Sequence, residues 1–285
     1  MDEGSGTNAA GFESSRREVP RLLWRDSVAS TNSELVRLAA DPELPAFTTL
    51  ITTDQTAGRG RLDRAWIAPA GTAIAVSVLA RVETPSGNRV GAPTLGWLPL
   101  AAGVAMADAV TSVLPSGSPV GIKWPNDVQI DGRKVCGILS ELVPSSAASP
   151  GVAVVIGAGL NVTMSAEQLP VPTATSLMLA GAGSDVADGA ELFDRVLAAY
   201  LRSLTAFLTA LRQNEGDADR SGLRAAVIDR CLTIGREVRV ELPGGAELLG
   251  GATGIDAAGR LEVRDGAGQV RAVAAGDIIH LRSDR

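Results

Sequence analysis

The chain of 285 residues changes character at Leu232, and this change limits the folds that are open to it. Before this point, stretches of helical length alternate with buried-strand patterns. After it, short strand-like runs such as REVRVEL, RLEVRD and IIHLR follow closely, separated by glycine- and aspartate-rich turns. Short strands at this spacing are typical of a small antiparallel barrel. The sequence therefore predicts an α+β protein in which residues 21–230 form a mixed β-sheet flanked by helices and residues 231–285 form a small β-barrel.

Periodicity and capping residues predict the elements of the larger domain. Polar capping residues open a helix over residues 32–40, and an apolar stripe at helical spacing predicts a long helix over residues 190–212. Another apolar helix ends at Pro115. The predicted buried strands cover residues 47–54, 72–82 and 152–162. The pair Asp131–Gly132 between two apolar runs predicts a two-residue hairpin.

The N-terminal residues, the apolar runs and the cysteines indicate the cellular compartment of the protein. Residues 1–20 are rich in glycine, serine and charge, which predicts a disordered tail, and they contain no apolar segment typical of a secretory signal. No apolar run reaches the roughly 18 residues that a membrane span needs. Cys136 and Cys231 make neither a disulfide framework nor a metal-binding pattern, and Cys136 is expected in the core. These features predict a cytoplasmic protein without a membrane partner.

The charged residues exclude some functions and point to others. The formal net charge of −6 argues against a surface built for nucleic-acid backbones, so no nucleic-acid partner is expected. The single histidine, His280, excludes a histidine-based triad or a histidine-rich metal site. Of the 26 basic residues, only Lys123 and Lys134 are lysines, and the other 24 are arginines. A lysine that persists in such a chain indicates a position that needs a compact ammonium rather than a planar guanidinium.

The segment DQTAGRGRLDRAW, residues 54–66, combines flexible backbone with positive charge. Gly58 and Gly60 leave backbone N–H groups unshielded, and Arg59, Arg61 and Arg64 can bind carboxylate or phosphate oxygens. The segment is therefore a candidate anion-binding loop. A solvated basic turn and an RGG-like nucleic-acid contact are the alternatives, and the acidic net charge counts against the second.

The segment KWPNDVQIDGRKVCGILSE, residues 123–141, is the most specific in the chain. Pro125 fixes its own φ and favours extended backbone at Trp124, so the next two side chains project from a rigid corner. We expect Asn126, Asp127 and Lys134 to gather at one rim of the hairpin. The alternative is an ordinary turn pair with an exposed lysine.

The segment VVIGAGLNV lacks the third glycine and the following helix of a dinucleotide-binding fingerprint. One interpretation is that Gly157 and Gly159 let the backbone approach a ligand, with Asn161 as a polar contact. The other is that they mark a bulge in a strand.

Together these segments resemble the biotin protein ligases. The matching segments are STN at 30–32, DQTAGRGRLDRAW at 54–66, KWPNDV at 123–128, GRKVCGILSE at 132–141 and GAGLNV at 157–162. The resemblance covers roughly residues 22–282. It is to the monofunctional form, because no DNA-binding helix-turn-helix is expected before the first domain. It implies a biotinyl/lipoyl ligase-like catalytic fold, of the class II synthetase type, followed by an SH3-like domain.

The resemblance implies a reaction in two steps. Biotin's carboxylate attacks the α-phosphate of ATP to give biotinyl-5′-AMP and pyrophosphate, and a lysine of a biotin carboxyl carrier protein domain then attacks the mixed anhydride. Mg²⁺ is expected with ATP, held largely by phosphate oxygens and water rather than by protein ligands.

The resemblance also assigns residues to roles. It places Arg59, Lys134 and Asp127 at the chemistry. The residues implied to bind biotin are Ser30, Thr31, Asn32, Gln55, Arg59, Gly60, Arg61, Lys134 and Gly137. Those implied to bind ATP or the adenylate are Arg59, Arg61, Trp66, Lys123, Asn126 and Asn161.

One position departs from the family pattern GRGRxGRxW, because Asp63 stands where glycine is common. Its charge and its stiffer backbone predict a weaker hold on biotinyl-5′-AMP than an Asp63→Gly variant would show, measured as the rate of adenylate release. Two other functions stay open at this point. A lipoate–protein ligase shares the scaffold and reaction type, and a non-catalytic biotin sensor would share the binding residues.

Overall fold

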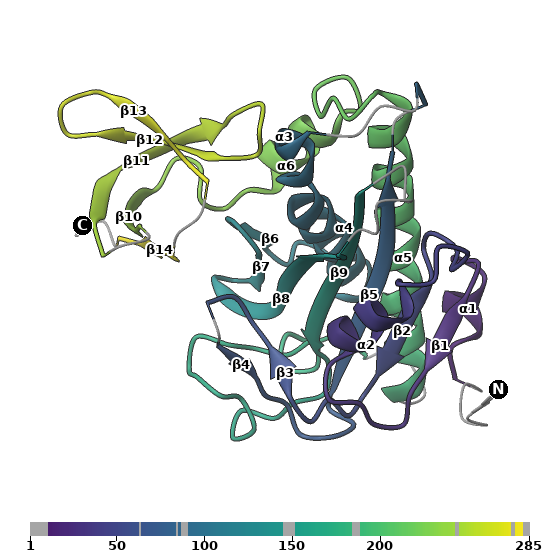
Figure 1. Ribbon diagram of the computed structural model, residues 1–285. Helices are drawn as coiled ribbons and strands as arrows, with labels where there is room; N and C mark the ends of the chain where they lie inside the picture. Colours follow the sequence, from purple (N-terminus) through teal and green to yellow (C-terminus); the bar gives the residue numbers. More distant parts are fainter. Residues whose placement is uncertain are drawn as a thin grey trace.

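The computed structural model describes residues 11–62, 64–83, 85–86, 91–144, 152–183, 189–242, 245–274 and 277–281. These residues form two units, a large mixed sheet with helices on its faces and a smaller antiparallel sheet beside it (Figure 1). The expected α+β class and the order of the two units are confirmed. The prediction about Asp63 falls outside the described residues.

The large sheet has seven strands in the order β1-β2-β5-β9-β8-β7-β6. β1 and β2 are parallel, and the remaining neighbours are antiparallel. A separate two-stranded ribbon, β3 with β4, carries the glycine–arginine segment. The strands are β1 (Leu22–Trp24), β2 (Thr49–Thr52), β3 (Gly58–Arg59), β4 (Ala65–Trp66), β5 (Ala73–Val82), β6 (Val120–Lys123), β7 (Asp127–Ile130), β8 (Arg133–Leu142) and β9 (Val152–Asn161).

The turn between β7 and β8 is the predicted hairpin. Asp131 and Gly132 both have positive φ, 49° and 72°, as a two-residue type I′ turn requires. This turn returns β8 along β7, so that Asp127 pairs with Gly137 and Gln129 with Lys134. The hairpin prediction is confirmed, and it brings the start of β8 next to the KWPND corner.

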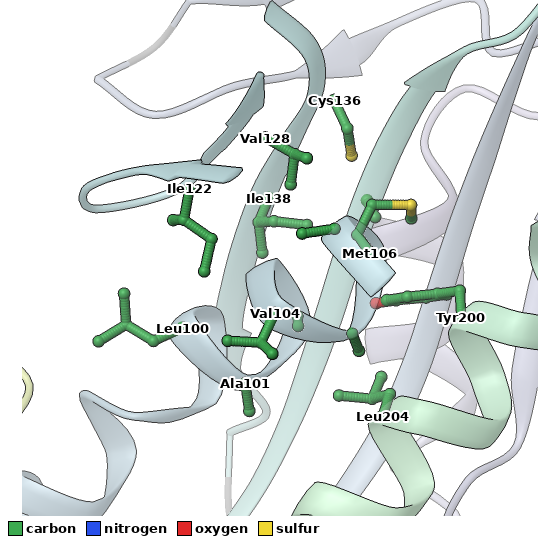
Figure 2. Close-up of a cluster of buried hydrophobic side chains, with 14 of the residues drawn as sticks. Leu100, Ala101, Val104, Met106, Ile122, Val128, Cys136, Ile138, Tyr200 and Leu204 are labelled. Carbon is green, nitrogen blue, oxygen red and sulfur yellow. The ribbon is translucent and has the colours of Figure 1, made fainter. Parts of the chain in front are cut away.

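Two long helices cover one face of the large sheet. They are α4 (Leu98–Val113), preceded by the short α3 (Ala92–Leu95), and α5 (Gly189–Gln213), which packs along α4. Figure 2 shows side chains of α4, of β6 to β8 and of α5 meeting in one apolar cluster that includes Cys136 and Tyr200. The stretch Ala92–Val113 is apolar and long enough to cross a membrane by composition alone, but 72% of its most apolar window is buried here. It is the core helix of this unit.

The opposite face carries α2 (Thr31–Leu38), which begins at the N-cap Ser30 as the capping pattern predicted. Leu35 of α2 packs on Leu50, Leu79 and Val155. Because side chains alternate along a strand, Val76 of β5 and Ile156 of β9 face the α4 side. The other face carries Leu79 and Val155 where α2 packs, and small residues further along the same two strands. On that second face Ala75 pairs with Gly159, and Ser77 pairs with Gly157. The sheet is thereby left thin beside the start of α2, where a ligand can approach it.

The N-terminal tail was predicted disordered up to residue 20, and this is wrong for residues 11–20. A short helix, α1 (Glu13–Arg16), lies against α5, and Phe12 and Val19 are buried. Asp194 of α5 accepts hydrogen bonds from the backbone N–H groups of Ser14 and Ser15 and from the Ser15 hydroxyl. A polar segment is ordered because a buried carboxylate on another element satisfies its donors. Residues 1–10 lie outside the described part.

The last two helical turns of the larger unit form α6 (Leu223–Arg230), after which the chain enters the five-stranded sheet β13-β12-β11-β10-β14. Its strands are β10 (Glu237–Glu241), β11 (Glu247–Ile255), β12 (Leu261–Asp265), β13 (Val270–Val273) and β14 (Asp277–His280). The closed barrel that the turn spacing predicted is not formed by the described residues. β14 pairs with β10 at one edge of the sheet and β13 forms the other edge, and no pairing between β13 and β14 joins these edges in the described residues.

Candidate active site

A cavity of about 480 Å³ lies on the α2 side of the large sheet, where the glycine–arginine ribbon, the KWPND corner and the C-terminal sheet meet. The larger unit supplies most of its lining. The C-terminal sheet adds Glu241, Ile278 and Ile279, which no part of the sequence analysis had connected with the site. All predicted site residues but one line this cavity, namely Ser30, Thr31, Asn32, Gln55, Arg59, Gly60, Arg61, Trp66, Lys123, Asn126, Asp127, Lys134 and Gly137.

The floor of the cavity is a hydrogen-bonded network around the start of α2. The backbone N–H and the hydroxyl of Thr31 both donate to Gln55 Oε1, at 2.9 and 3.1 Å. The buried hydroxyl of Ser77 lies 2.8 Å from Thr31 Oγ1 and 2.6 Å from Asn32 Oδ1. Asn32 Nδ2 donates to the carbonyl oxygen of Leu139 at 3.1 Å. Because these polar groups are buried and mutually bonded, they present a fixed surface to a ligand.

Two glycines of β9 make room for this surface. A Cβ atom at Gly157 would lie 2.1 Å from Asn32 Oδ1, and one at Gly159 would lie 2.5 Å from Cε2 of the Trp66 ring. The prediction that the backbone of these glycines approaches a ligand stays a prediction. What approaches their backbone in the structure is a pair of site side chains, which therefore sit directly on the sheet.

Lys134, Asp127 and Asn126 gather at one rim, as the hairpin geometry predicted. Lys134 Nζ lies 2.6 Å from Asp127 Oδ1 and 5.9 Å from the centroid of the Trp66 ring. A Cβ atom at Gly137 would lie 3.0 Å from Lys134 Nζ, so the glycine leaves space for the ammonium. The Lys134 ammonium is thus held over the cavity between a carboxylate and an aromatic ring.

The arginines of the glycine-rich segment are anchored on opposite sides of the cavity. Arg61 Nη1 donates to Asn126 Oδ1 at 3.0 Å, and Asn126 Nδ2 donates to the Ile138 carbonyl oxygen at 2.8 Å. Arg59 Nη2 instead donates to Glu141 Oε2 at 2.8 Å and to Ser33 Oγ at 2.9 Å. The ribbon therefore reaches both β8 and α2, with its guanidinium groups at the mouth of the cavity.

Burial changes the protonation behaviour of the cations. It lowers the pKa of Lys123, with Lys134 and Arg64 acting in the same direction and Asp127 opposing them. It also lowers the pKa of Arg61, against the effect of Asp127. A partly desolvated cation gains more from an entering anion than a fully hydrated one does. The cavity is therefore suited to a ligand that carries negative charge.

The C-terminal sheet is tied to the KWPND corner. The indole Nε1 of Trp124 donates to the Gly259 carbonyl oxygen at 3.1 Å, and the Trp124 backbone N–H donates to Thr233 Oγ1 at 3.0 Å. Thr233 Oγ1 lies 3.1 Å from His280 Nε2. Burial lowers the pKa of His280 to about 4, and the charges of Lys123 and Arg236 act in the same direction. The neutral imidazole is part of the contact between the two units.

One predicted ligand residue is placed elsewhere. Asn161 is buried, its Nδ2 donates to the Thr175 carbonyl oxygen at 2.9 Å, and it does not line the cavity. Its amide fixes residues 173–175, whose backbone pairs with Lys134. Sequence reasoning also missed Ser77 and Glu141. Ser77 was detectable as the one hydroxyl inside the apolar run AIAVSVL, whereas Glu141 at the end of a strand gave no such signal.

Comparisons with known proteins first identify the class of protein to which the fold belongs. Residues 25–161 match the Biotin/lipoate A/B protein ligase family, and residues 233–281 match the Biotin protein ligase C terminal domain. A solved biotin protein ligase from Aquifex aeolicus, in complex with biotin and ATP, has the same fold, with a TM-score of 0.66 and 24% identity over 93% of this chain and all of that one.

Proteins with similar sequences identify the family within this class. This chain is 41% identical to a biotin--[acetyl-CoA-carboxylase] ligase of Mycobacterium tuberculosis, over 91% of this chain and 90% of that protein. It is 34% identical to a ligase of the same name from Paracoccus denitrificans, over 84% of this chain and 92% of that protein. The chain belongs to the biotin protein ligase family.

Proposed function

We propose that this protein activates biotin with ATP and transfers it to a lysine of a carboxylase carrier protein. The observation that carries the proposal is the meeting of Lys134, Arg59 and Arg61 around one cavity whose floor is the polar STN segment. The family and the names of the relatives point to the same activity.

The first step joins two anions, the biotin carboxylate and the α-phosphate of ATP. A carboxylate oxygen attacks phosphorus, the bond to the bridging oxygen breaks, and pyrophosphate leaves with the electron pair. The repulsion between the reactants is reduced by positive charge that is already in place. Lys134 has that position, because its ammonium is fixed between Asp127 and Trp66 at the rim. Arg59 and Arg61 reach the same mouth from the ribbon.

The second step needs an amine from the carrier. The neutral amine attacks the carbonyl carbon of the mixed anhydride, an amide bond forms, and AMP leaves. We assign to Asp127, at the rim of the cavity beside Lys134, the role of holding the incoming ammonium and taking up its proton, and the family resemblance supports this assignment. We find no thiol suited to a covalent intermediate among the described residues, because Cys136 and Cys231 are buried and burial raises the pKa of both.

Mg²⁺ belongs to this proposal as a companion of the nucleotide. The described residues contain no group of three or more histidine, cysteine, aspartate or glutamate side chains that could hold a metal ion. Mg²⁺ that accompanies ATP is usually held by one or two carboxylates, the phosphate oxygens and water. The use of ATP and two free cysteines support a cytoplasmic location.

The test is incubation of the protein with ATP, Mg²⁺ and radiolabelled biotin, with and without a biotin carboxyl carrier protein domain. We expect biotin-dependent pyrophosphate release and then label on the carrier. Lipoate in place of biotin should give neither product. Activation of lipoate alone would assign the other ligase of this scaffold, and binding of biotin without any adenylate would make the protein a sensor.

A further inference from the structure

Glu141 lies near the end of β8 and does not line the cavity, yet it contacts Arg59 of the glycine–arginine ribbon β3–β4. We propose that Glu141 is a positioning residue that sets the orientation of Arg59 for the anionic ligands. The inference rests on the proposed function, because Arg59 matters to activity only if the cavity binds such ligands.

The contact is centred on one oxygen atom. Glu141 Oε2 accepts a hydrogen bond from Arg59 Nη2 and another from Asn32 Nδ2, both at 2.8 Å. Arg59 Nη2 also donates to Ser33 Oγ at 2.9 Å. The Arg59 side chain is 47% exposed and that of Glu141 is 24% exposed. A half-exposed arginine loses its orientation readily to solvent, so two acceptors on one nitrogen restrict it substantially.

Glu141 is itself held by the floor of the cavity. Asn32, which binds it, is fixed by the Ser77 hydroxyl and by the Leu139 carbonyl oxygen. Asn32 also rests on the bare backbone of Gly157. A continuous path of hydrogen bonds therefore runs from β5 through α2 and β8 to the ribbon. The orientation of Arg59 is set by the same network that shapes the pocket floor.

The path leaves part of the guanidinium available. Among the described residues, Arg59 Nε and Nη1 make no hydrogen bond, and Arg59 lines the cavity. A carboxylate or phosphate can therefore use these donors while Nη2 stays on Glu141. Preorganisation of this kind reduces the ordering cost that a ligand must otherwise meet.

The kinetic experiment is a double-mutant cycle of Glu141→Ala and Arg59→Ala, with Glu141→Gln as the variant that keeps the shape. We expect Glu141→Ala to raise the KM for biotin roughly three- to tenfold and to change kcat less. Glu141→Gln should have a smaller effect, since its amide oxygen can still accept from Asn32 and Arg59. In the Arg59→Ala background the change at position 141 should have almost no effect on KM.

A second measurement needs no substrate. Trypsin cleaves after arginine, so the cutting rate at Arg59, Arg61 and Arg64 reports the order of the ribbon. Glu141→Ala should be cut there several-fold faster than the wild type, with an unchanged thermal unfolding midpoint. Glu34→Ala is the matched control, because it removes a 2.9 Å ion pair to Arg37 within α2 and leaves the ribbon untouched.

Three results would overturn the inference. Tighter biotin binding by Glu141→Ala would show that the carboxylate competes with the ligand for Arg59. An equal effect of Glu141→Ala with and without Arg59 would show that it acts through another group. Unchanged trypsin cleavage in both Glu141 variants would show that it does not order the ribbon. A failure of the proposed function is seen separately, as a wild-type protein without biotin-dependent pyrophosphate release.

Discussion

Lys134 shows how much one side chain can require of its surroundings. Its ammonium needs the Asp127 carboxylate at 2.6 Å, the Trp66 ring on one side and the absence of a side chain at position 137. A guanidinium is broader and planar, so we expect it to fit the space between Asp127, the Trp66 ring and Gly137 poorly. This geometry supports the prediction that position 134 needs a compact ammonium in a chain whose other cations are nearly all arginines.

We predict that Lys134→Arg keeps the fold and loses most adenylation, with a fall in kcat/KM of roughly 10²- to 10³-fold. The measurement is biotin-dependent pyrophosphate release, beside a far-ultraviolet circular dichroism spectrum. Arg37→Lys, on the exposed side of α2, is the control and should be silent. Full activity of Lys134→Arg would mean that charge alone, not ammonium geometry, is needed at this position.

The glycines under the site allow a second prediction at this scale. Gly159→Ala places a methyl group 2.5 Å from the Trp66 ring, so the ring must move off the sheet. We expect the free energy of unfolding to fall by about 1–3 kcal/mol, and ATP to bind more weakly. Urea unfolding and ATP titration measure the two effects. Gly266→Ala has open space around it and should change neither.

At the scale of elements, strands and helices position the site through contacts between distant segments. The β7–β8 hairpin carries Asp127 and Lys134, the start of α2 carries the STN floor, and the β3–β4 ribbon spans them. The N-terminal segment is likewise held by a contact with a distant part of the chain. α1 has only four residues, and it is held because Asp194 of α5 accepts hydrogen bonds from its first backbone N–H groups. Burial acts to raise the pKa of Asp194, but the hydrogen bonds from Ser15 and Ser14 outweigh it and the pKa is lowered.

We predict that Asp194→Ala releases α1 from α5 without loss of the main fold. Removal of an acceptor that satisfies buried donors should cost about 1–3 kcal/mol of stability. Hydrogen exchange should become fast in residues 12–19 and stay slow in the strands of the large sheet. Asp229→Ala, on the exposed side of α6, should leave both measurements unchanged. Continued protection of residues 12–19 in Asp194→Ala would show that Phe12 and Val19 suffice to hold the segment.

At the scale of the whole molecule, the C-terminal sheet completes the cavity as well as packing beside it. Ile278, Ile279 and Glu241 form part of the cavity wall. Two indole hydrogen bonds tie the loop after β11 to the large unit, from Trp97 to the Ala257 carbonyl oxygen at 2.9 Å and from Trp124 to that of Gly259 at 3.1 Å. Trp124 therefore belongs both to the cavity lining and to the interface between the units. A change that weakens this interface is expected to alter the cavity as well.

This coupling predicts a pH dependence. The pKa of His280 is lowered to about 4 from an ordinary value of 6.5, so the folded protein favours the neutral ring. The stability that depends on the neutral ring is fully present above pH 6.5 and is lost as the pH falls toward 4, because the unfolded chain binds the proton first. We expect urea unfolding to show a steeper loss of stability across this window for the wild type than for His280→Gln. Parallel curves for the two proteins would exclude His280 as the cause.

The sequence by itself determined the local chemistry of this protein. Turn residues such as Asp131 and Gly132, the capping segment at Ser30 and the alternation of apolar runs reflect short-range backbone preferences, so these elements were predictable. The site residues were predicted from the family resemblance of their motifs. Short-range preferences do not reveal which distant groups satisfy one another. Only the tertiary structure decided that Asn161 supports the backbone beside Lys134, that Glu141 holds Arg59 and that Asp194 orders residues 11–20. It also decided that Ile278 and Ile279 of the last strand line the cavity and that this strand does not pair with β13 to close a barrel. For Asn161 and Asp194 the physical reason is that a buried polar group needs a hydrogen-bond partner, and the fold supplied one from another segment of the chain.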